Sequence, residues 1–579
     1  MPVHHPSLTT IRPWRYIPSV WDALIFALVL GVVALIAYGG HETTQPLAAV
    51  AHTPISLDPA HLPYYALRTT LRMLAGIICS LVFTLAYGAL AQKSRRAEMV
   101  LIPVLDILQS LPVFTFVTVT LAFFLKLFPG SVMGEELCSV FTIFTAQAWN
   151  MTFSFYQSLK TVPKDLSDVS DSLRLGGWRR FWTLEVPFAA PGLIWNAMMS
   201  MSGAWFFVVA SEALTVGSHS ITLPGIGAYV NAALLHEDLG AIGWAVLTML
   251  VVILIYDQLL FRPLVAWSQK FRVELSASDG PEASSWLLDF FQRARLAQRV
   301  FSPLFSLTSA FARLRIGRPF RPPPVVAKAW ESRTTDYVWL TVIAGTAVWF
   351  AWQGVVFLSQ TLHIGDVLQV IGLGLLTLLR VIVLITLASL LWVPIGVWIG
   401  LRPRLAEAVQ PIAQFLAAFP SNLLFPAAVF LIVKYHGNAD IWLSPLIILG
   451  TQWYILFNVI AGASAIPNDL LEAAASFRLR GWNWWRKVAL PAVFPYFVTG
   501  AITASGGAWN ASIVAEVVTW GAQKLEAHGL GAYIGDAMIK GDMQRSVLGA
   551  VVMSVFVVLF NRLFWRPLFD FAARRTALN

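Results

Sequence analysis

The chain has 579 residues, of which 57% are hydrophobic and only 12% are charged, and its mean hydropathy is +0.68. Soluble domains carry about 25% charged residues, so this composition excludes an ordinary soluble protein and predicts a polytopic membrane protein. The formal net charge of +9 does not indicate nucleic-acid binding, because the cations cluster in loops beside apolar segments, where the positive-inside rule expects them.

Twelve apolar segments are each long enough to cross a bilayer core of about 30 Å as a helix. The first half of the chain has six, near 20–39, 67–92, 100–127, 137–160, 190–214 and 240–264. The second half has six more, near 336–358, 367–400, 409–434, 441–465, 493–518 and 545–569. The sequence therefore predicts an all-α protein with about twelve membrane-spanning helices.

The Lys and Arg residues predict the orientation of these helices. Basic residues precede the first segment and follow the second segment of each half, whereas loop 215–239 has none. Residues 1–19 also lack the apolar core and cleavage pattern of a signal peptide. We therefore expect a cytoplasmic N-terminal segment, 1–19, and a cytoplasmic tail, 570–579.

Residues 265–335, between the halves, are basic and rich in proline, which predicts a cytoplasmic linker. Within it, residues 284–301 have the pattern of an amphipathic helix. Such a helix is compatible with two positions, on the membrane surface or in solvent.

The two halves repeat each other. An offset of 304 residues relates Trp149 to Trp453, Gly177-Trp178 to Gly481-Trp482, Glu212 to Glu516 and Arg262-Pro263 to Arg566-Pro567, and upstream an offset of 308 relates Arg72 to Arg380 and Pro112 to Pro420. Six spans in each half preserve the orientation of the repeat. We therefore expect two tandem six-helix units, 20–264 and 336–569, related by a pseudo-twofold axis along the membrane normal, and a substrate path can lie on that axis.

Each unit contains a basic, Trp-containing loop, at 163–187 and 467–491. Each copy begins with a proline, continues with an acid-bearing helix, then a glycine and a short basic helix, and ends with the proline that starts the next span. A plain positive-inside loop needs only a few Lys or Arg residues. The repeated spacing therefore predicts a helix–turn–helix element exposed to the cytoplasm.

This spacing resembles the EAA loop of permease subunits of bacterial type I ATP-binding-cassette (ABC) importers, whose coupling helix docks on the ATPase subunit. The second copy reads Glu472-Ala473-Ala474 and the first Asp168-Val169-Ser170, and both copies have Arg where the family has Gly. The resemblance implies ATPase-coupling residues in both copies: Asp168, Arg174, Gly177, Pro187, Glu472, Ala473, Ala474, Arg478, Gly481 and Pro491.

More narrowly, the chain resembles the nitrate/sulfonate/taurine/bicarbonate branch of these permeases. The residues that carry this resemblance are Thr70-Leu71-Arg72, Leu378-Leu379-Arg380, Ala204-Trp205 to Glu212, Ala508-Trp509 to Glu516, and the Gly-Ile-Gly or Gly-Leu-Gly that follows. The resemblance implies a fused permease dimer in the bacterial inner membrane, a solute-binding protein as partner, and a small anion as substrate.

The sequence contains no Gly-Lys pair, which a phosphate-binding P-loop requires. ATP and Mg²⁺ are therefore expected on a separate ATPase dimer, and no cofactor or catalytic residue is expected in this chain.

Four charged residues lie near the ends of spans two and five: Arg72, Arg380, Glu212 and Glu516. Ionisable residues in spans often face a cavity, which favours a role in the translocation path or its gate. Two alternatives stay open: the glutamates could fix helix ends by hydrogen bonds, and the arginines could extend to lipid headgroups. The residues Gly227, Asp238, Gly531 and Asp542 lie in the predicted outer loops and are candidates for docking the solute-binding protein.

Other functions leave features of the sequence unexplained. A membrane enzyme would need a cluster of His, Asp or Cys, but the ten His are scattered and the two cysteines, Cys79 and Cys138, show no metal-ligand spacing. A channel or secondary carrier would leave the EAA-like loops without a role. Among importers, the alternative is a fused permease for ferric iron or a thiamine-type substrate.

Overall fold

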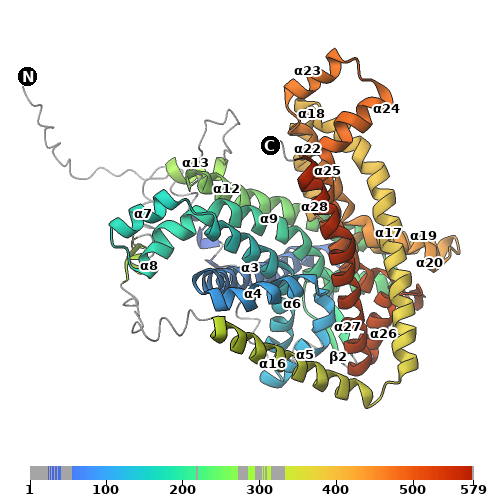
Figure 1. The fold of residues 1–579 in the computed structure, drawn as a ribbon. Coiled ribbons are helices and arrows are strands. Elements are labelled where there is room, and N and C mark those ends of the chain that lie inside the picture. The colour runs from blue at the N-terminus through green and yellow to red at the C-terminus, as the bar shows by residue number, and fades with distance from the viewer. Residues whose placement is uncertain are drawn as a thin grey trace, which may run out of the picture.

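The computed structural model describes residues 55–216, 219–271, 285–293, 309–314 and 333–576, with scattered positions between 24 and 40 and residues 303 and 306. These residues are helical apart from turns and two short β-hairpins. Figure 1 shows two helical units, blue to green and yellow to red, whose helices pack against each other. The prediction of an all-α membrane protein with a duplicated unit is confirmed.

The helices of the first unit are α3 (Leu62–Lys93), α4 (Arg95–Ser110), α5 (Val117–Leu127), α6 (Met133–Lys160), α7 (Lys164–Ser172), α8 (Gly177–Arg180), α9 (Val186–Ser211), α10 (Ile226–Leu235), α11 (Leu239–Tyr256) and α12 (Arg262–Ser268). Those of the second unit are α16 (Arg333–Ser359), α17 (Ile364–Gly400), α18 (Pro403–Ala418), α19 (Phe425–Lys434), α20 (Ala439–Trp442), α21 (Ser444–Leu449), α22 (Gln452–Ser464), α23 (Asn468–Ser476), α24 (Gly481–Trp484), α25 (Leu490–Ala515), α26 (Leu530–Lys540), α27 (Met543–Phe560) and α28 (Arg566–Thr576).

An antiparallel hairpin follows the fifth span of each unit. Strand β1 (Ala213–Val216) pairs with β2 (His219–Thr222), and β3 (Val517–Trp520) pairs with β4 (Gln523–Glu526). Each hairpin returns the chain to the end of the span that precedes it. The next helix, α10 or α26, therefore packs against the end of α9 or α25.

Seven helices among the described residues are long and apolar enough to cross a membrane, or nine if each of two bent helix pairs counts as one span. This is fewer than the twelve expected. Most of the predicted span 20–39 lies outside the described residues. Two more predicted spans of the first unit are not long and apolar enough: the third is divided into α4 and α5, and α6 is long but has polar residues such as Gln147 and Asn150 in its middle.

Prolines divide the predicted spans 100–127 and 409–434. Leu111 and Phe419 precede Pro112 and Pro420 and have ψ angles of 134° and 129°, outside the helical range, because a following proline disfavours the α conformation. Short 3₁₀ turns, η2 (Val113–Phe116) and η6 (Ser421–Leu424), connect the two parts. In the second unit the parts are bent by 80°.

Prolines also widen four helix turns without ending the helix. The N–H of Val186 bonds to the carbonyl of Phe181, and that of Leu490 bonds to the carbonyl of Trp485, each five residues back. These π-turns, η3 (Phe181–Glu185) and η7 (Trp485–Ala489), precede Pro187 and Pro491, and η4 (Asp257–Phe261) and η8 (Asn561–Trp565) stand in the same way before Pro263 and Pro567. Wider turns accommodate the ring that would meet a carbonyl in a regular helix.

Contacts between the two units occur in reciprocal pairs. Helix α11 contacts η6, while α27 contacts η2; likewise α10 contacts β3, while α26 contacts β1. A twofold relation produces such exchanged contacts. Buried apolar side chains of both units form one connected cluster that includes Phe155 and Trp509.

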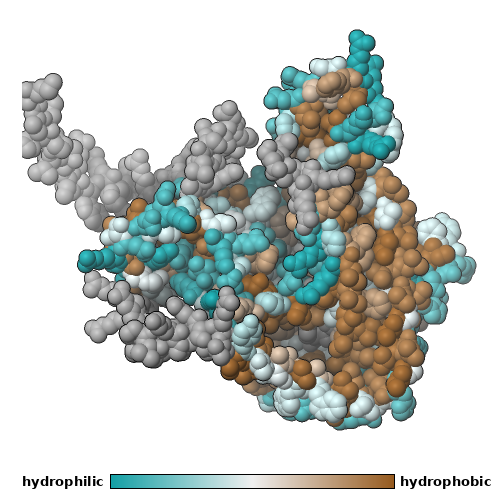
Figure 2. All heavy atoms as spheres, in the orientation of Figure 1, coloured by the Kyte–Doolittle hydropathy of each residue, from teal (hydrophilic) through white to brown (hydrophobic). Residues whose placement is uncertain are grey.

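The surface follows this arrangement. In Figure 2, hydrophobic residues cover α17 and α27, whereas hydrophilic residues gather over α7 and α8 at the left and over α23 and α24 at the top. The uncovered apolar band is what a lipid-facing surface requires.

Part of the linker is described. Residues Trp286–Arg293 form helix α13, which confirms helix formation in the first part of the segment 284–301. Helix α13 packs against α12. The limits of the linker and of the other domains, and the side of the membrane on which they lie, stay predictions.

Candidate functional site

The two repeated loops have the same backbone. Two residues past the ends of α7 and α23, Arg174 and Arg478 adopt the left-handed conformation with φ angles of 49° and 50°. The next amides bond five residues back, Leu175 N to the Ser170 carbonyl at 3.1 Å and Leu479 N to the Ala474 carbonyl at 3.0 Å. This is a Schellman ending, which usually has glycine at the left-handed position. The arginines therefore keep the backbone that the family's glycine would give.

A small residue is buried at the same place in each loop. Ser170 is 2% exposed and Ala474 is 4% exposed, whereas Asp168 and Glu472 are exposed. The third residue of the Glu-Ala-Ala motif therefore faces the protein, and the first faces outward. The Ser170 hydroxyl is buried without a hydrogen-bond partner.

The predicted short basic helix after Gly177 is the beginning of the next span. One helix runs from Gly177 to Ser211, and its counterpart runs from Gly481 to Ala515. Both repeated loops are therefore joined rigidly to a span, and Gly481 enters its helix with a φ angle of +55°.

Ion pairs fix the first loop, and among the described residues they have no counterpart in the second. Arg180 bonds Asp171 through Nη1 at 3.2 Å and Ser167 through Nη2 at 3.2 Å, and it lies 3.2 Å from the carboxylate of Glu185. Lys93 also reaches Glu185, at 3.5 Å. The residues at the matching positions of the second loop are Leu471, Ala475, Trp484 and Ala489.

The linker contacts the first loop only, within the part of the chain that the structure describes. The Trp178 indole N–H donates to the Phe311 carbonyl at 2.8 Å, and the Phe311 ring lies 5.1 Å from the Trp178 ring and 5.5 Å from the Trp182 ring. In the second loop, Trp482 is exposed, and Arg486 stands at the position that matches Trp182.

Glu98 links the start of α4 to the end of α6, just before the first loop. The Lys160 ammonium and the Tyr156 hydroxyl both donate to its carboxylate, each at 2.5 Å. These hydrogen bonds, that of Lys160 first, lower the pKa of Glu98 below its usual value.

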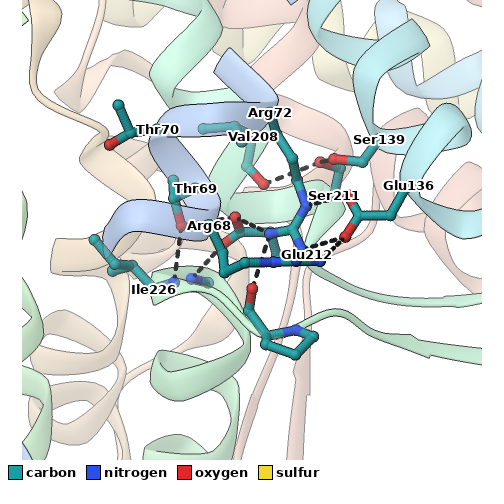
Figure 3. Close-up of polar contacts among 12 residues, drawn as sticks. Arg68, Thr69, Thr70, Arg72, Glu136, Ser139, Val208, Ser211, Glu212 and Ile226 are labelled. Atoms are coloured by element: carbon teal, nitrogen blue, oxygen red, sulfur yellow. Dashed lines mark hydrogen bonds and ion pairs between the residues drawn. The ribbon is translucent and has the colours of Figure 1, made fainter. Parts of the chain in front are cut away.

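The predicted path residues Arg72 and Glu212 meet in a buried cluster at the opposite end of the first unit. Arg72 bonds Glu212 at 2.7 Å and Glu136 at 2.6 Å, and Arg68 bonds Glu136 at 2.5 Å (Figure 3). Thr69 donates to Glu212 at 2.7 Å. Two arginines and two glutamates balance one another's charge, as buried ions require.

The second unit repeats this cluster. Arg380 bonds Glu516 at 3.1 Å and Asp440 at 2.9 Å, and Thr377 donates to Glu516 at 3.0 Å. The Asp440 carboxylate also accepts a bond from the His528 amide at 2.7 Å. In this structure each of the four predicted path residues is held by partners of its own unit, which favours a role in fixing helix ends; a role in the path or gate stays a prediction.

The Gly-Ile-Gly and Gly-Leu-Gly motifs let the backbone approach these carboxylates. The Gly227 amide donates to Glu212 at 2.8 Å, and the Ala532 amide donates to Glu516 at 3.0 Å. A Cβ on Gly227 would overlap the Val209 carbonyl, and one on Gly531 would overlap the Ser512 carbonyl. Only glycine fits this approach.

The predicted docking residues divide between the interior and the surface. Gly227 and Gly531 are buried, so a partner would meet the residues around them. Asp238 accepts from the Ala241 amide and Asp542 from the Arg545 amide, each at 3.0 Å, so both cap helices beside exposed loops. Their docking role stays a prediction.

The sequence analysis missed several residues of these clusters. Glu136 and Asp440 are related by the 304-residue offset, and Thr69 and Thr377 by the 308-residue offset. A search for polar residues repeated at those offsets would have found them. Among the described residues, no group of three or more His, Cys, Asp or Glu could hold a metal ion.

Two cavities lie between the units. A cavity of about 620 Å³ lies between α9, α11 and α12 of the first unit and α18 of the second. A cavity of about 520 Å³ lies between α4 and α9 of the first unit and α25 and α27 of the second. Trp195 and Tyr454 line both, so the cavities adjoin at the centre of the interface.

Two stretches of the chain, residues 73–262 and 392–565, match the family model described as binding-protein-dependent transport system inner membrane component. Together they make up more than half of the chain, and each lies within one unit. The family match is therefore duplicated in the same way as the fold.

Similar proteins include a bicarbonate transport system permease protein of Synechocystis, 30% identical over 173 residues, which are 30% of this chain and 57% of that protein. A nitrate import permease protein of Leptolyngbya laminosa is 28% identical over 187 residues, 32% of this chain and 63% of its own length. The match thus spans less than two thirds of both relatives. A glycine betaine/proline betaine transport system permease protein of Escherichia coli is 23% identical over 285 residues, 49% of this chain and 72% of that protein.

Proposed function

This chain belongs to the family of binding-protein-dependent transport system inner membrane components, and we propose that it forms both halves of the transmembrane path of an ATP-driven importer. The duplication carries the proposal. Two family matches, reciprocal contacts and cavities at the interface give one chain the parts of a permease dimer. Its membrane would be the bacterial inner membrane, with both termini on the cytoplasmic side.

The proposed partners on the cytoplasmic side are two ATPase subunits, one at each repeated loop, which would hold ATP and Mg²⁺. Large apolar side chains on these loops support a protein partner: Leu173 is 66% exposed and Phe477 is 80% exposed. Coupling would run through α9 and α25, because each loop is continuous with one of these helices. A channel or secondary carrier would leave these loops without a partner.

The proposed substrate is a small anion of the nitrate, sulfonate or bicarbonate kind, delivered by a solute-binding protein. This proposal rests on the similarity to bicarbonate and nitrate transport permeases. Arg72 and Arg380 add little to it, because carboxylates already pair them. A fused permease for ferric iron or a thiamine-type solute is the second candidate, since such permeases also carry two EAA loops.

The test begins with the solute-binding protein encoded beside this chain. Its melting temperature is measured with nitrate, bicarbonate, taurine, a thiamine precursor and ferric iron, since a bound ligand raises it. The solute that stabilises it is then followed into proteoliposomes that contain this chain, the neighbouring ATPase and the binding protein. We expect an anion to be taken up when ATP is supplied to the ATPase and not when ATP is left out.

Two outcomes would contradict parts of the proposal. Stabilisation by iron or a thiamine precursor alone would overturn the substrate class and leave the importer standing. Uptake that proceeds at the same rate without ATP would identify a channel or secondary carrier instead.

A further inference from the structure

The two interface cavities are built from matching positions of the duplicated units. Met201, Trp205 and Ala417 line the cavity of about 620 Å³, which we call the Met201 cavity. The cavity of about 520 Å³, which we call the Ser505 cavity, is lined by the matching residues. Ser505 and Trp509 match Met201 and Trp205 by the offset of 304 residues, and Gln109 matches Ala417 by the offset of 308. They are therefore counterparts about the pseudo-twofold axis.

The Ser505 cavity presents polar side chains that have no partner. Gln109, Ser505 and Asn561 line it and make no side-chain hydrogen bond within the described residues. Ser505 is 3% exposed, so its hydroxyl reaches this cavity and little other solvent. Of the three, Ser505 is buried, Asn561 is half-buried and Gln109 is exposed. Because buried polar groups are usually hydrogen-bonded, the unpaired Ser505 hydroxyl indicates a ligand or water in this cavity.

The Met201 cavity lacks such groups at the same positions; the one unpaired hydroxyl among the described residues of its wall, that of Tyr256, is itself buried away from the cavity surface. Met201 replaces Ser505 and Ala417 replaces Gln109. Asp257, which replaces Asn561, lies 3.2 Å from Arg262 and is already paired. The Gln414 amide donates to the Met198 sulfur at 3.2 Å, and the Ser202 hydroxyl meets the Tyr454 hydroxyl at 2.5 Å.

We infer that only the Ser505 cavity is a solute site of the transmembrane path, and that it takes a small solute with hydrogen-bond-accepting oxygens, such as an oxyanion. This inference rests on the proposed function. Side-chain amides and a hydroxyl can donate to such oxygens. A homodimer must have two identical cavities, whereas a fused chain can carry different polar groups in each.

The site recognises its solute without a fixed positive charge. Among the described residues that line the Ser505 cavity there is no Lys, Arg or His, and the single carboxylate is Asp106. Hydrogen bonds between neutral groups are weaker than those that include a cation. Such a site orients a solute without retaining it, as passage to the other side requires.

The test compares matched variants in proteoliposomes that contain this chain, its ATPase and its binding protein. Gln109→Ala and Ser505→Ala, combined, remove an amide and a hydroxyl from the Ser505 cavity. Gln414→Ala and Gln258→Ala, combined, remove two amides from the Met201 cavity without breaking a bond to Tyr454, which lines both cavities. Uptake of labelled nitrate, bicarbonate and taurine and ATP hydrolysis are measured with a saturating concentration of loaded binding protein.

We expect the first pair to lower uptake of the transported solute about tenfold, as the loss of two hydrogen bonds implies. The second pair should change uptake less than about twofold. Equal losses in both pairs, or no loss in the first, would overturn the inference while the importer function stands. Absence of ATP-dependent uptake in the unmodified chain would instead count against the proposed function. Melting temperatures of both pairs within about 2 °C of the unmodified protein exclude a folding defect as the cause.

Discussion

Arg174 and Arg478 hold a backbone conformation that costs a side-chain-bearing residue about 1–2 kcal/mol relative to glycine. Replacing Arg174 by glycine should therefore raise the stability of the purified protein by about 1 kcal/mol. Arg478→Gly should act in the same direction. Thermal melting in detergent measures both.

The control is Arg179→Gly, which lies on the adjacent helix α8. There glycine should destabilise by about 1 kcal/mol, because the backbone is helical. A loss of stability in Arg174→Gly similar to that in Arg179→Gly would contradict the argument from the backbone angle.

Ser170 and Ala474 allow a reciprocal exchange. The Ser170 hydroxyl is buried without a partner, and such a group costs about 1–3 kcal/mol. Ser170→Ala should stabilise the protein, and Ala474→Ser should destabilise it by a similar amount. Thermal melting of the two variants and of the double exchange checks this; changes of the same sign in both single variants would exclude the explanation.

The buried ion pairs predict unequal effects in the two units. Arg72 is 3% exposed and lies 2.7 Å from Glu212, whereas Arg380 is 15% exposed and lies 3.1 Å from Glu516. Removing one member of a buried pair costs about 3–5 kcal/mol. Arg72→Met should therefore destabilise by about that amount, and Arg380→Met by less. Urea or thermal unfolding in detergent measures the difference; an equal or larger loss in Arg380→Met would contradict it.

For single residues, the sequence identified Arg72, Glu212 and their repeats as candidates but did not predict which residues they contact. The offsets showed which residues correspond, yet pairing depends on how α3, α6 and α9 pack together. The unpaired groups Gln109, Ser505 and Asn561 are not repeated in type between the units, so duplication gave no signal for them.

Hydropathy predicted where the long apolar segments lie, but not where the helices within them break or bend. The segments 100–127 and 409–434 are apolar throughout, but Pro112 and Pro420 divide them. A hydropathy window averages over such a break, whereas the restriction on the residue before proline acts on one backbone angle. Before Pro187 and Pro491 the helix does not end: it widens to a π-turn and continues. Proline alone therefore does not predict whether a helix ends.

The contact between the linker and α8 predicts a difference in proteolysis. Trp178 contributes a hydrogen bond and an aromatic contact to Phe311, each worth about 1 kcal/mol. Trp178→Ala should therefore speed trypsin cleavage at the neighbouring Arg313 about tenfold. Mass spectrometry of the fragments measures the rate.

The matched control is Trp482→Ala in the second loop, where the tryptophan is exposed. It should leave cleavage at Arg313 unchanged. If both variants speed cleavage equally, the effect is general loosening, and the contact between Trp178 and Phe311 does not hold the linker.

In the molecule as a whole, the fold is duplicated and its contacts have diverged. The units share the loop backbone, the buried charge clusters and the π-turns. They differ in the ion pairs of Arg180, in the linker contact and in the two interface cavities. The repeat in the sequence predicted the shared features. It could not predict the differences, because they depend on which side chains meet across elements distant in the sequence.

This divergence predicts that two ATPase subunits would be held unequally. Arg180 and the linker residue Phe311 bond the first loop, whereas among the described residues the second loop has Trp484 in place of Arg180 and no hydrogen bond to the linker. If Glu472 bonds the ATPase, Glu472→Ala removes a charge-assisted hydrogen bond and should lower ATP-driven uptake about tenfold. Asp168→Ala should lower it less, and Asp168→Glu should change it less than about twofold.

Uptake in proteoliposomes and the number of ATPase subunits retained per permease, measured by native mass spectrometry, distinguish unequal from equal docking. Loss of one ATPase subunit in Glu472→Ala, with both retained in Asp168→Ala, is the expected result. Equal losses in the two variants would mean that the linker and Arg180 do not contribute to docking. The two loops would then differ in their contacts within the permease, but they would present equivalent docking surfaces to the two ATPase subunits.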